Sequence, residues 1–257
     1  MAGTIALRGG LAARGRPALR AAAAAALVFA AAAAAAFDPT EVDRLWRTNV
    51  CVRCDLAEAD LSGAALPGVI LTDALLWDAD LANADLNGAY LRGARLSRAN
   101  LAGAQLSGAD LAGTNMTGAD LSGADLRGAI FWRAVVVGAT LADAGLQSAD
   151  LSDAYFVEAD LRNALLGNAR LVRTDFRNAD LTGANLTNAT LDGTLLGGTI
   201  LRGAVLEGAR MNGVYLAHAD LTDANLHFAE FIDVDLTGAV LCRTVMPGGD
   251  IDNRDCP

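Results

Sequence analysis

Large apolar and small residues recur along this chain with a period of five. From Leu56 to Leu241 an apolar residue returns at every fifth position without an insertion or deletion, and the residue two places earlier is usually alanine. Of these 38 units, 31 have leucine at the centre and 30 have alanine at the small site. A period of five matches neither the 3.6-residue turn of a helix nor the two-residue alternation of a flat strand. The chain must turn in the same sense after each unit, which predicts a coil.

Two positions of each unit are suited to the interior of such a coil. An alanine beside each leucine keeps a narrow core close-packed, because a second large side chain would overfill it and a polar one would be left unpaired. The other three positions hold mainly Asp, Asn, Ser, Thr, Arg and Gly, and we expect them to face outward. Glycine is frequent two residues after the centre, as at Gly63 and Gly103, which suits a corner with positive φ.

Units of the form A-(D/N)-L-x-x in unbroken phase over residues 51–246 resemble the pentapeptide repeat proteins. The resemblance implies an all-β solenoid, a right-handed quadrilateral β-helix in which four units make one square coil. With coils stacked about 4.8 Å apart, the array would form a rod roughly 45 Å long. The open ends of such a solenoid need caps.

Residues 1–36 differ in composition from the rest and predict an export signal or leader. They contain four arginines, no acidic residue and a nearly pure alanine run from Ala21 to Ala36. A disordered low-complexity leader or a transit peptide is the alternative. The run is shorter than the roughly 20 residues of a membrane span, so we expect no stable membrane insertion of the mature chain. The predicted location is exported, periplasmic or secreted, with the thylakoid lumen as the alternative.

Residues 37–50 predict a short amphipathic helix that caps the first coil. Asp38 suits the N-cap, Pro39 the first helical position and Glu41 the partner in a capping box, and Leu45 lies on the apolar face. We expect this helix to be a lid. A membrane-binding helix is the alternative, which its short length and mixed charge disfavour.

Four cysteines lie in two pairs, one at each end of the array. Cys51 and Cys54 form C-V-R-C at predicted core positions, and without a second C-x-x-C, paired histidines or a thioredoxin-like pattern they predict a disulfide or buried thiols rather than a zinc or redox site. Cys242 and Cys256 bracket the point where the five-residue signal stops, and a disulfide there would clamp a C-terminal cap at residues 247–257. An even count fits an exported chain, and both flanking motifs resemble exported and lumenal members of the family.

The sequence offers few groups for catalysis, so we predict neither an enzyme nor a cofactor. The two histidines, His218 and His227, fall at outward positions. No nucleophile elbow, phosphate-binding glycine loop or H-E-x-x-H motif is found.

Residues twenty apart should lie on one side of the rod, and one such column is an acidic ladder. Its rungs would repel one another unless they are solvated or bound by cations. The aspartates either form hydrogen bonds with the backbone at the corner, or bind Ca²⁺ weakly or a basic partner. The aspartates of this column are Asp60, Asp80, Asp120, Asp160, Asp180 and Asp220.

A second set of outward positions is apolar and aromatic. All seven centres that are not leucine fall on the same two of the four columns, whereas random drift would spread them over all four. Such a strip is a candidate partner surface, and side chains folded back over a broader local core are the alternative. The set is Leu75, Trp77, Ile130, Trp132, Val135, Val137, Tyr155, Val157 and Tyr215.

These features predict a non-enzymatic exported scaffold, a rigid rod that presents an acidic face and an apolar aromatic strip to a protein partner or to a second copy. The net charge of -10 allows a second function, because some pentapeptide repeat proteins are acidic rods that imitate DNA and occupy a topoisomerase. Export would separate the chain from such enzymes, and we predict no nucleic-acid partner.

Overall fold

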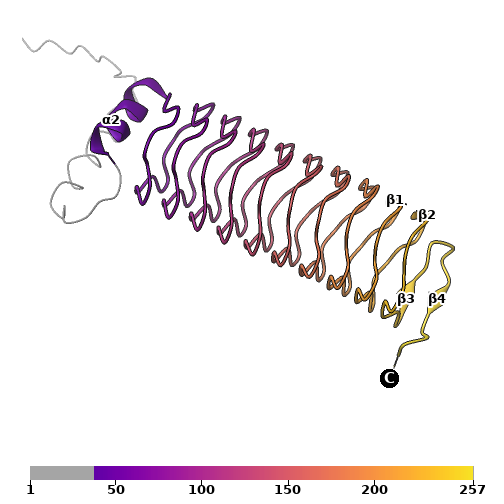
Figure 1. Cartoon of the computed structure of the whole chain (residues 1–257). Coiled ribbons are helices and arrows are strands. Elements are labelled where there is room, and N and C mark those ends of the chain that lie inside the picture. Colours follow the sequence, from indigo (N-terminus) through magenta and orange to yellow (C-terminus); the bar gives the residue numbers. More distant parts are fainter. Residues whose placement is uncertain (1–37, 257) are drawn as a thin grey trace, which may run out of the picture. The chain divides into compact units, whose positions relative to one another are not determined.

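The computed structural model describes residues 38–256, and the predicted leader at 1–36 lies outside the described residues. Between residues 38 and 256 the chain forms a helix followed by coils that stack along one axis (Figure 1). No helix in this part of the chain is long and apolar enough to cross a membrane.

Helix α2, Pro39–Thr48, lies at the N-terminal end of the coils (Figure 1). The Asp38 side chain caps it by accepting the Thr40 amide, and Asn49 ends it in the left-handed conformation with a φ of 55°. Leu45 is fully buried and belongs to the same apolar cluster as the leucines of the first coil. The helix therefore covers the first coil, as the amphipathic pattern predicted.

The predicted capping box at Glu41 does not form. The Asp38 amide donates instead to the Asp55 carbonyl of the first coil, at 3.4 Å. Since that amide is already paired, Glu41 has no capping role, and its carboxylate lies 3.7 Å from the Arg44 guanidinium.

The coils are joined by parallel pairing between residues twenty apart. Isolated bridges begin at Val50↔Ile70 and continue to Asn225↔Val245. Up to Leu226, the amide of a centre typically donates to the carbonyl nineteen residues ahead, as from Leu56 to Leu75 at 2.8 Å. Only the last coils contain longer strands: β1, Arg210–Asn212, pairs in parallel with β2, Glu230–Ile232, and β3, Thr244–Val245, pairs antiparallel with β4, Ile251–Asp252.

Each coil has four sides, which we number in chain order. Side I carries Ile130, side II Val135, side III Thr140 and side IV Gly145, together with the residues twenty before and after each of these. The acidic ladder lies on side III. The apolar strip lies on sides I and II.

The interior is filled by the residues that the period placed there. The leucine centres from Leu56 to Leu226 are no more than 2% exposed. Some alanine sites hold threonine instead, and Thr194 satisfies its buried hydroxyl by donating to the Leu171 carbonyl at 2.6 Å. Six of the seven other centres are fully buried as well: Met116, Phe131, Val136, Phe156, Phe176 and Met211.

The corner two residues after each centre has positive φ in almost every unit. Glycine occupies many of these corners, but Arg98 has a φ of 57° and Asp153 one of 60°. Charged corner residues twenty apart pair across coils, as Arg98 does with Asp78 and Arg173 with Asp153. Glycine is therefore favoured at the corner but not required.

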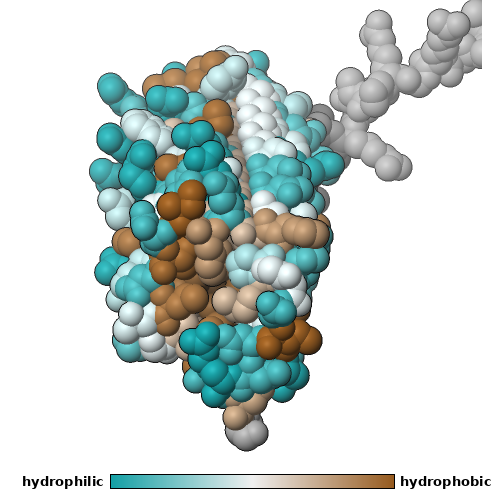
Figure 2. Space-filling model, turned by 90° about the vertical axis from the view of Figure 1, so that its right-hand side faces the viewer, coloured by the Kyte–Doolittle hydropathy of each residue, from teal (hydrophilic) through white to brown (hydrophobic). Residues whose placement is uncertain are grey.

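The two cysteine pairs form disulfides. Cys51 is bonded to Cys54 beneath α2, and Cys242 is bonded to Cys256. The second bond holds the C-terminal tail against the last coil, and Figure 2 looks on to this end of the rod.

Candidate interaction surface

The carboxylates of the acidic ladder bond the backbone at the corners of side III. Asp60 Oδ1 accepts the Ser62 amide at 3.1 Å, and Asp80 Oδ1 accepts the Ala82 amide at 3.0 Å. Asp120, Asp180 and Asp220 repeat this contact with the amide two residues ahead. These hydrogen bonds support the interpretation in which the aspartates stabilise the backbone at the corners. Cation binding stays a prediction.

Two rungs of the ladder are also neutralised by arginine. Arg162 pairs with Asp160 at 2.6 Å, and Arg202 reaches Asp220 from the preceding coil at 2.5 Å. The pKa of Asp160 lies below its usual range because the hydrogen bond from Arg162 outweighs the effect of burial. Side III is thus less negative than its column of aspartates indicates.

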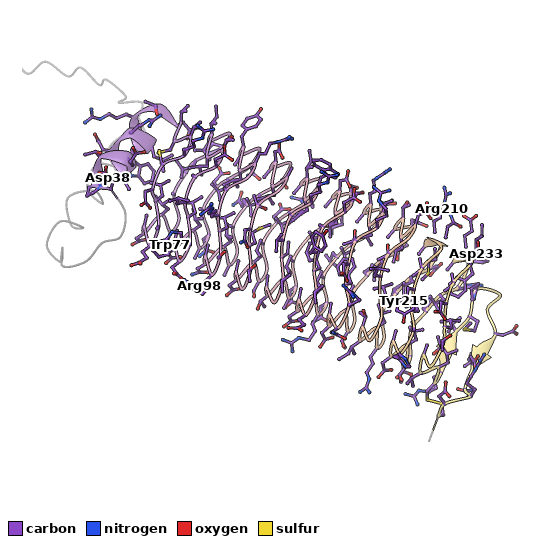
Figure 3. All side chains as sticks on the ribbon, viewed as in Figure 1. Asp38, Trp77, Arg98, Arg210, Tyr215 and Asp233 are labelled. Carbon is purple, nitrogen blue, oxygen red and sulfur yellow. A yellow bond between two sulfur atoms is a disulfide. The ribbon has the colours of Figure 1, made fainter. Side chains whose placement is uncertain are left out.

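The predicted apolar strip divides into exposed and half-buried residues. The exposed members lie on sides I and II near the middle and C-terminal half of the rod, and Figure 3 places Trp77 and Tyr215 along the same side. Leu75, Trp77, Val135, Val137 and Val157 are half-buried between neighbouring rungs. The most exposed are Tyr155 at 51%, Ile130 at 41%, Trp132 at 39% and Tyr215 at 39%.

The core beneath this strip is the bulkiest part of the interior. The Phe156 ring lies 5.9 Å from that of Phe131 and 5.1 Å from that of Phe176, measured between centroids. All three rings point inward and are fully buried. The substituted centres consequently widen the core without accounting for the exposed Tyr155 and Trp132 outside it.

A charged network fixes Trp132 at the corner between sides I and II. Its indole Nε1 donates to Asp153 Oδ2 at 3.2 Å, and the Arg133 guanidinium lies 4.3 Å from the ring centroid. Arg173 forms two hydrogen bonds to Asp153, each at 2.7 Å. The hydrogen bonds from Arg173 hold the pKa of Asp153 below its usual value. The tryptophan is held by the Arg133 cation at its ring and by a carboxylate that Arg173 fixes, so its exposed ring has a defined orientation.

A shallow hollow of about 460 Å³ opens beside this corner. Asp175 is one of its lining residues and is only 5% exposed, and Arg177 pairs with it at 2.7 Å. Burial alone would raise the pKa of Asp175, but the hydrogen bonds from Arg177 lower it below its usual range. The residues around the hollow are Arg133, Asp153, Tyr155, Arg173, Asp175 and Leu195.

Tyr215 lies back across side II because the preceding coil has a glycine beneath it. A Cβ atom on Gly197 would lie 2.7 Å from Cε1 of the tyrosine ring, closer than such contacts occur. The missing side chain therefore makes room for the ring. Beside it, a second shallow hollow is lined by Arg177, Asn178 and His218 among others.

Of the residues around the first hollow, only Tyr155 was a predicted site residue. Asp175 and Leu195 lie in the same twenty-residue column as Tyr155 but were not selected, and no prediction was made for Arg133, Asp153 and Arg173. Arg173 and Asp153 are twenty apart at the corner position, so a comparison of that column would have revealed the pair. The contact of Arg133 with Trp132 had a weaker signal, since adjacent residues in a turn do not have to touch.

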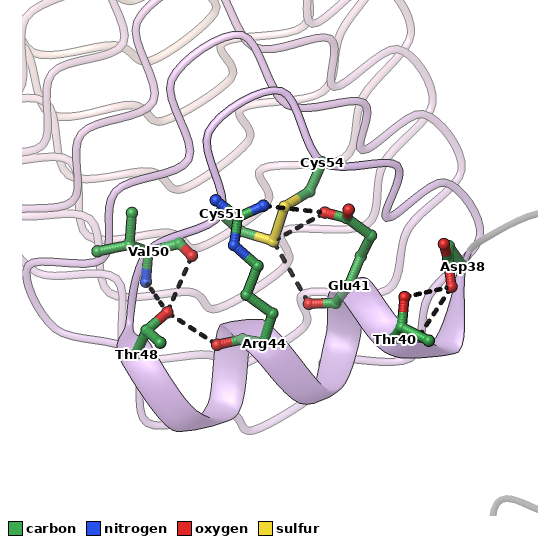
Figure 4. Close-up of polar contacts among 8 residues, drawn as sticks. All are labelled: Asp38, Thr40, Glu41, Arg44, Thr48, Val50, Cys51 and Cys54. Atoms are coloured by element: carbon green, nitrogen blue, oxygen red, sulfur yellow. Dashed lines mark hydrogen bonds and ion pairs between the residues drawn. A yellow bond between two sulfur atoms is a disulfide. The ribbon is translucent and has the colours of Figure 1, made fainter.

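A further cluster joins α2 to the first coil. Glu41 offers a carboxylate oxygen 3.7 Å from Cys51 Sγ, and Cys54 lies next to it (Figure 4). These three side chains could together hold a metal ion only with both thiols free, and the Cys51–Cys54 disulfide occupies both. The cluster serves to dock the helix.

The geometry defines a class of protein: a right-handed quadrilateral β-helix with a helical cap at one end and a disulfide-clamped tail at the other. The model of the family described as Pentapeptide repeats matches residues 50–78, 79–118, 94–133, 119–156, 159–198 and 199–238. The chain belongs to this family.

Two solved structures illustrate the likeness. HetL, a pentapeptide repeat protein involved in heterocyst differentiation regulation in the cyanobacterium Nostoc sp. strain PCC 7120, is 32% identical, with a TM-score of 0.62 over 83% of this chain and 98% of HetL. QnrB1, a plasmid-mediated fluoroquinolone resistance protein, is 19% identical, with a TM-score of 0.56 over 73% of this chain and 91% of that one. The second likeness concerns the fold alone. No curated protein matches the sequence.

Proposed function

We propose that this chain is a non-enzymatic exported scaffold whose rigid rod binds a protein partner through the apolar strip on sides I and II. We take residues 1–36 as the leader, 37–50 as the capping helix, 51–246 as the repeat array and 247–257 as the C-terminal cap. The observation that carries the proposal is the set of exposed aromatic rings at Trp132, Tyr155 and Tyr215.

Three properties of the strip support a protein contact. Aromatic side chains anchor interfaces because they bury a large area at little cost in conformational entropy. Trp132 is held by its hydrogen bond to Asp153, and the Tyr215 ring packs against Gly197. Binding would therefore require little further ordering of either ring. The paired arginines around the hollow offer polar contacts at the rim of the surface.

Exposed apolar residues on the other sides are isolated from one another. Leu165 on side IV is 42% exposed and Ile200 on side III is 38% exposed, and neither has an aromatic neighbour twenty residues away. Scattered apolar residues of this kind are ordinary on protein surfaces. They provide a matched control for the strip.

The proposal is tested by affinity capture from the compartment in which the chain is found. The double variant Tyr155→Ser/Tyr215→Ser should keep the circular dichroism of the rod and lose the partner. The control Leu165→Ser/Ile200→Ser removes the same number of exposed apolar side chains from sides III and IV and should retain it. Equal recovery of every bound protein by the two variants would refute the contact surface.

Export is tested separately by the mass of the mature chain. Cleavage before or near Phe37 is expected if residues 1–36 are a signal. An intact Met1 in the cytoplasm would contradict export and restore DNA mimicry as the better hypothesis.

A further inference from the structure

The C-terminal end of the rod is covered over only half of its last coil. The tail returns antiparallel along β3, where β4 pairs with it, and the Cys242–Cys256 disulfide fixes its end. Asp255 Oδ2 accepts the Leu241 amide at 2.9 Å and Asn253 Oδ1 accepts the Arg243 amide at 3.0 Å. These contacts give hydrogen-bond acceptors to the backbone amides on sides III and IV of the last coil.

Sides I and II of the last coil end in an unpaired strand edge. One coil earlier, the corresponding amides of Gly213, Leu216 and His218 donate to carbonyls of the next coil at 2.7 to 2.9 Å. At the end of the rod, no acceptor within residues 38–256 meets the corresponding amides. These belong to Phe231, Asp233, Leu236 and Gly238.

The strand at this edge is β2, which pairs on one side with β1 and has nothing on the other within the described residues. Phe231 in β2 and Asp233, the first residue after it, are two places apart, which is the spacing of amides that point to the same edge of a strand. The carbonyls of Ala229 and Val234 accept no hydrogen bond from residues 38–256 either. An edge of this kind is a template for a further strand.

The core is also open at this edge. Met211, Val214 and Leu216 of the preceding coil are 0%, 1% and 0% exposed. Their counterparts in the last coil are only partly buried: Phe231, Val234 and Leu236. Figure 2 faces this end and shows apolar surface beside the hydrophilic tail. Backbone donors and apolar side chains therefore occur together.

The charges around the edge are acidic. Asp233 forms no ion pair within the described residues, and Glu230 only approaches Arg210 at 4.0 Å. The arginines near the tail are engaged elsewhere, Arg243 by Asp223 and Arg254 by Asp252. A second copy of the same end would bring like charges together, whereas a segment with lysine or arginine would complement them.

We propose that the free edge of β2 binds an extended, basic segment of a partner protein, which adds to β1 and β2 as a third strand and covers Phe231 and Leu236. Backbone hydrogen bonds supply the general affinity of such strand addition, and the acidic residues select basic side chains. This site lies at the end of the rod and is independent of the strip on its sides.

The test uses the full chain and a fluorescein-labelled ten-residue peptide that alternates lysine and valine. Fluorescence anisotropy should show saturable binding, at least tenfold weaker for a glutamate–valine peptide and for a lysine–valine peptide N-methylated at alternate amides. Hydrogen exchange should slow across residues 231–238 when the peptide binds.

Two variants separate this site from general attraction to an acidic rod. Glu230→Lys/Asp233→Lys should weaken peptide binding at least tenfold. Glu58→Lys/Glu158→Lys changes the net charge equally at exposed positions elsewhere and should leave binding within twofold. Tyr155→Ser/Tyr215→Ser should also leave it unchanged.

Three results would overturn the proposal. One is the absence of binding. Another is a loss of discrimination, in which the chain binds the normal and the N-methylated peptide equally, or in which Glu230→Lys/Asp233→Lys and Glu58→Lys/Glu158→Lys bind the normal peptide equally. The third is a concentration-dependent dimer that protects residues 231–238 from exchange and blocks the peptide, because the edge would then belong to a second copy.

Discussion

Single side chains decide which parts of this chain can tolerate a charge. Leu141 is fully buried at a mid-array centre, whereas the adjacent Thr140 lies on side III between Asp120 and Asp160. Leu141→Asp should unfold the neighbouring coils, since an unpaired buried carboxylate costs several kcal/mol. Thr140→Asp is the control and should keep the β-rich circular dichroism. Retained structure in Leu141→Asp would contradict the inward assignment.

The position of Tyr215 depends on a missing Cβ one coil earlier. Gly197→Ala should displace the ring and destabilise the rod by about 1 kcal/mol, because a well-packed contact would be overfilled. Gly167 occupies the same place in its own unit, and a Cβ there would meet nothing closer than 3.8 Å. Denaturant midpoints should fall for Gly197→Ala and stay constant for Gly167→Ala. A fall of the same size in both would show that the glycine itself, not the ring, matters.

Among the larger elements, the C-terminal tail depends on its disulfide. Beyond Cys242 the tail contributes one short antiparallel pairing, β3 with β4, and few apolar contacts. Cys242→Ser should therefore lower the melting temperature under oxidising conditions, because the tail would lose its tether. With reductant present, the variant and the parent chain should melt alike. A parent chain that melts at the same temperature with and without reductant would argue against the clamp.

The helix shows how far local sequence can predict an element. Asp38, Pro39 and the apolar face predicted α2 because capping and amphipathic spacing are local properties. The capping box failed because the Asp38 amide meets Asp55, a contact that depends on how the helix docks on the first coil. The pairs around the hollow were missed for the same reason, since Arg173 and Asp153 become neighbours only through the twenty-residue coil.

For the molecule as a whole, the repeat predicted a coil, and the family resemblance implied its right-handed, four-sided form. Once four units make one coil, the repeat also separates the sides, because it fixes the register of every residue. The repeat did not predict which outward side chains are half-buried against the rod and which are exposed. Val135 and Tyr155 share one column, yet the first is half-buried and the second exposed. That difference depends on side-chain size and on the neighbouring rungs.

The pairs between arginine and aspartate give the rod a common dependence on pH. The hydrogen bond from Arg127 lowers the pKa of Asp125 to about 2, and neighbouring arginines also lower those of Asp153 and Asp160. A carboxyl with a lowered pKa stabilises the fold above its unfolded pKa near 3.9 and loses that contribution as pH falls through the folded value. Denaturant midpoints should accordingly drop between about pH 4 and pH 2.

Arginine variants test this cause. Arg127→Gln should reduce the acid-induced drop, because Asp125 would lose the hydrogen bond that lowers its pKa. Arg95 forms no ion pair within residues 38–256, so Arg95→Gln should leave the drop unchanged. Equal midpoints at pH 7 and pH 2.5 for the parent chain would contradict the account.

The central claim is that one pair of sides of the rod, and not the others, contacts a protein. A photoreactive benzoylphenylalanine at position 155 replaces an exposed aromatic ring with another, and the same residue at position 165 probes side IV. In cells that produce the chain, irradiation should give a discrete cross-linked product from position 155 that is absent from position 165. The same products from both positions, or none from position 155, would contradict the claim.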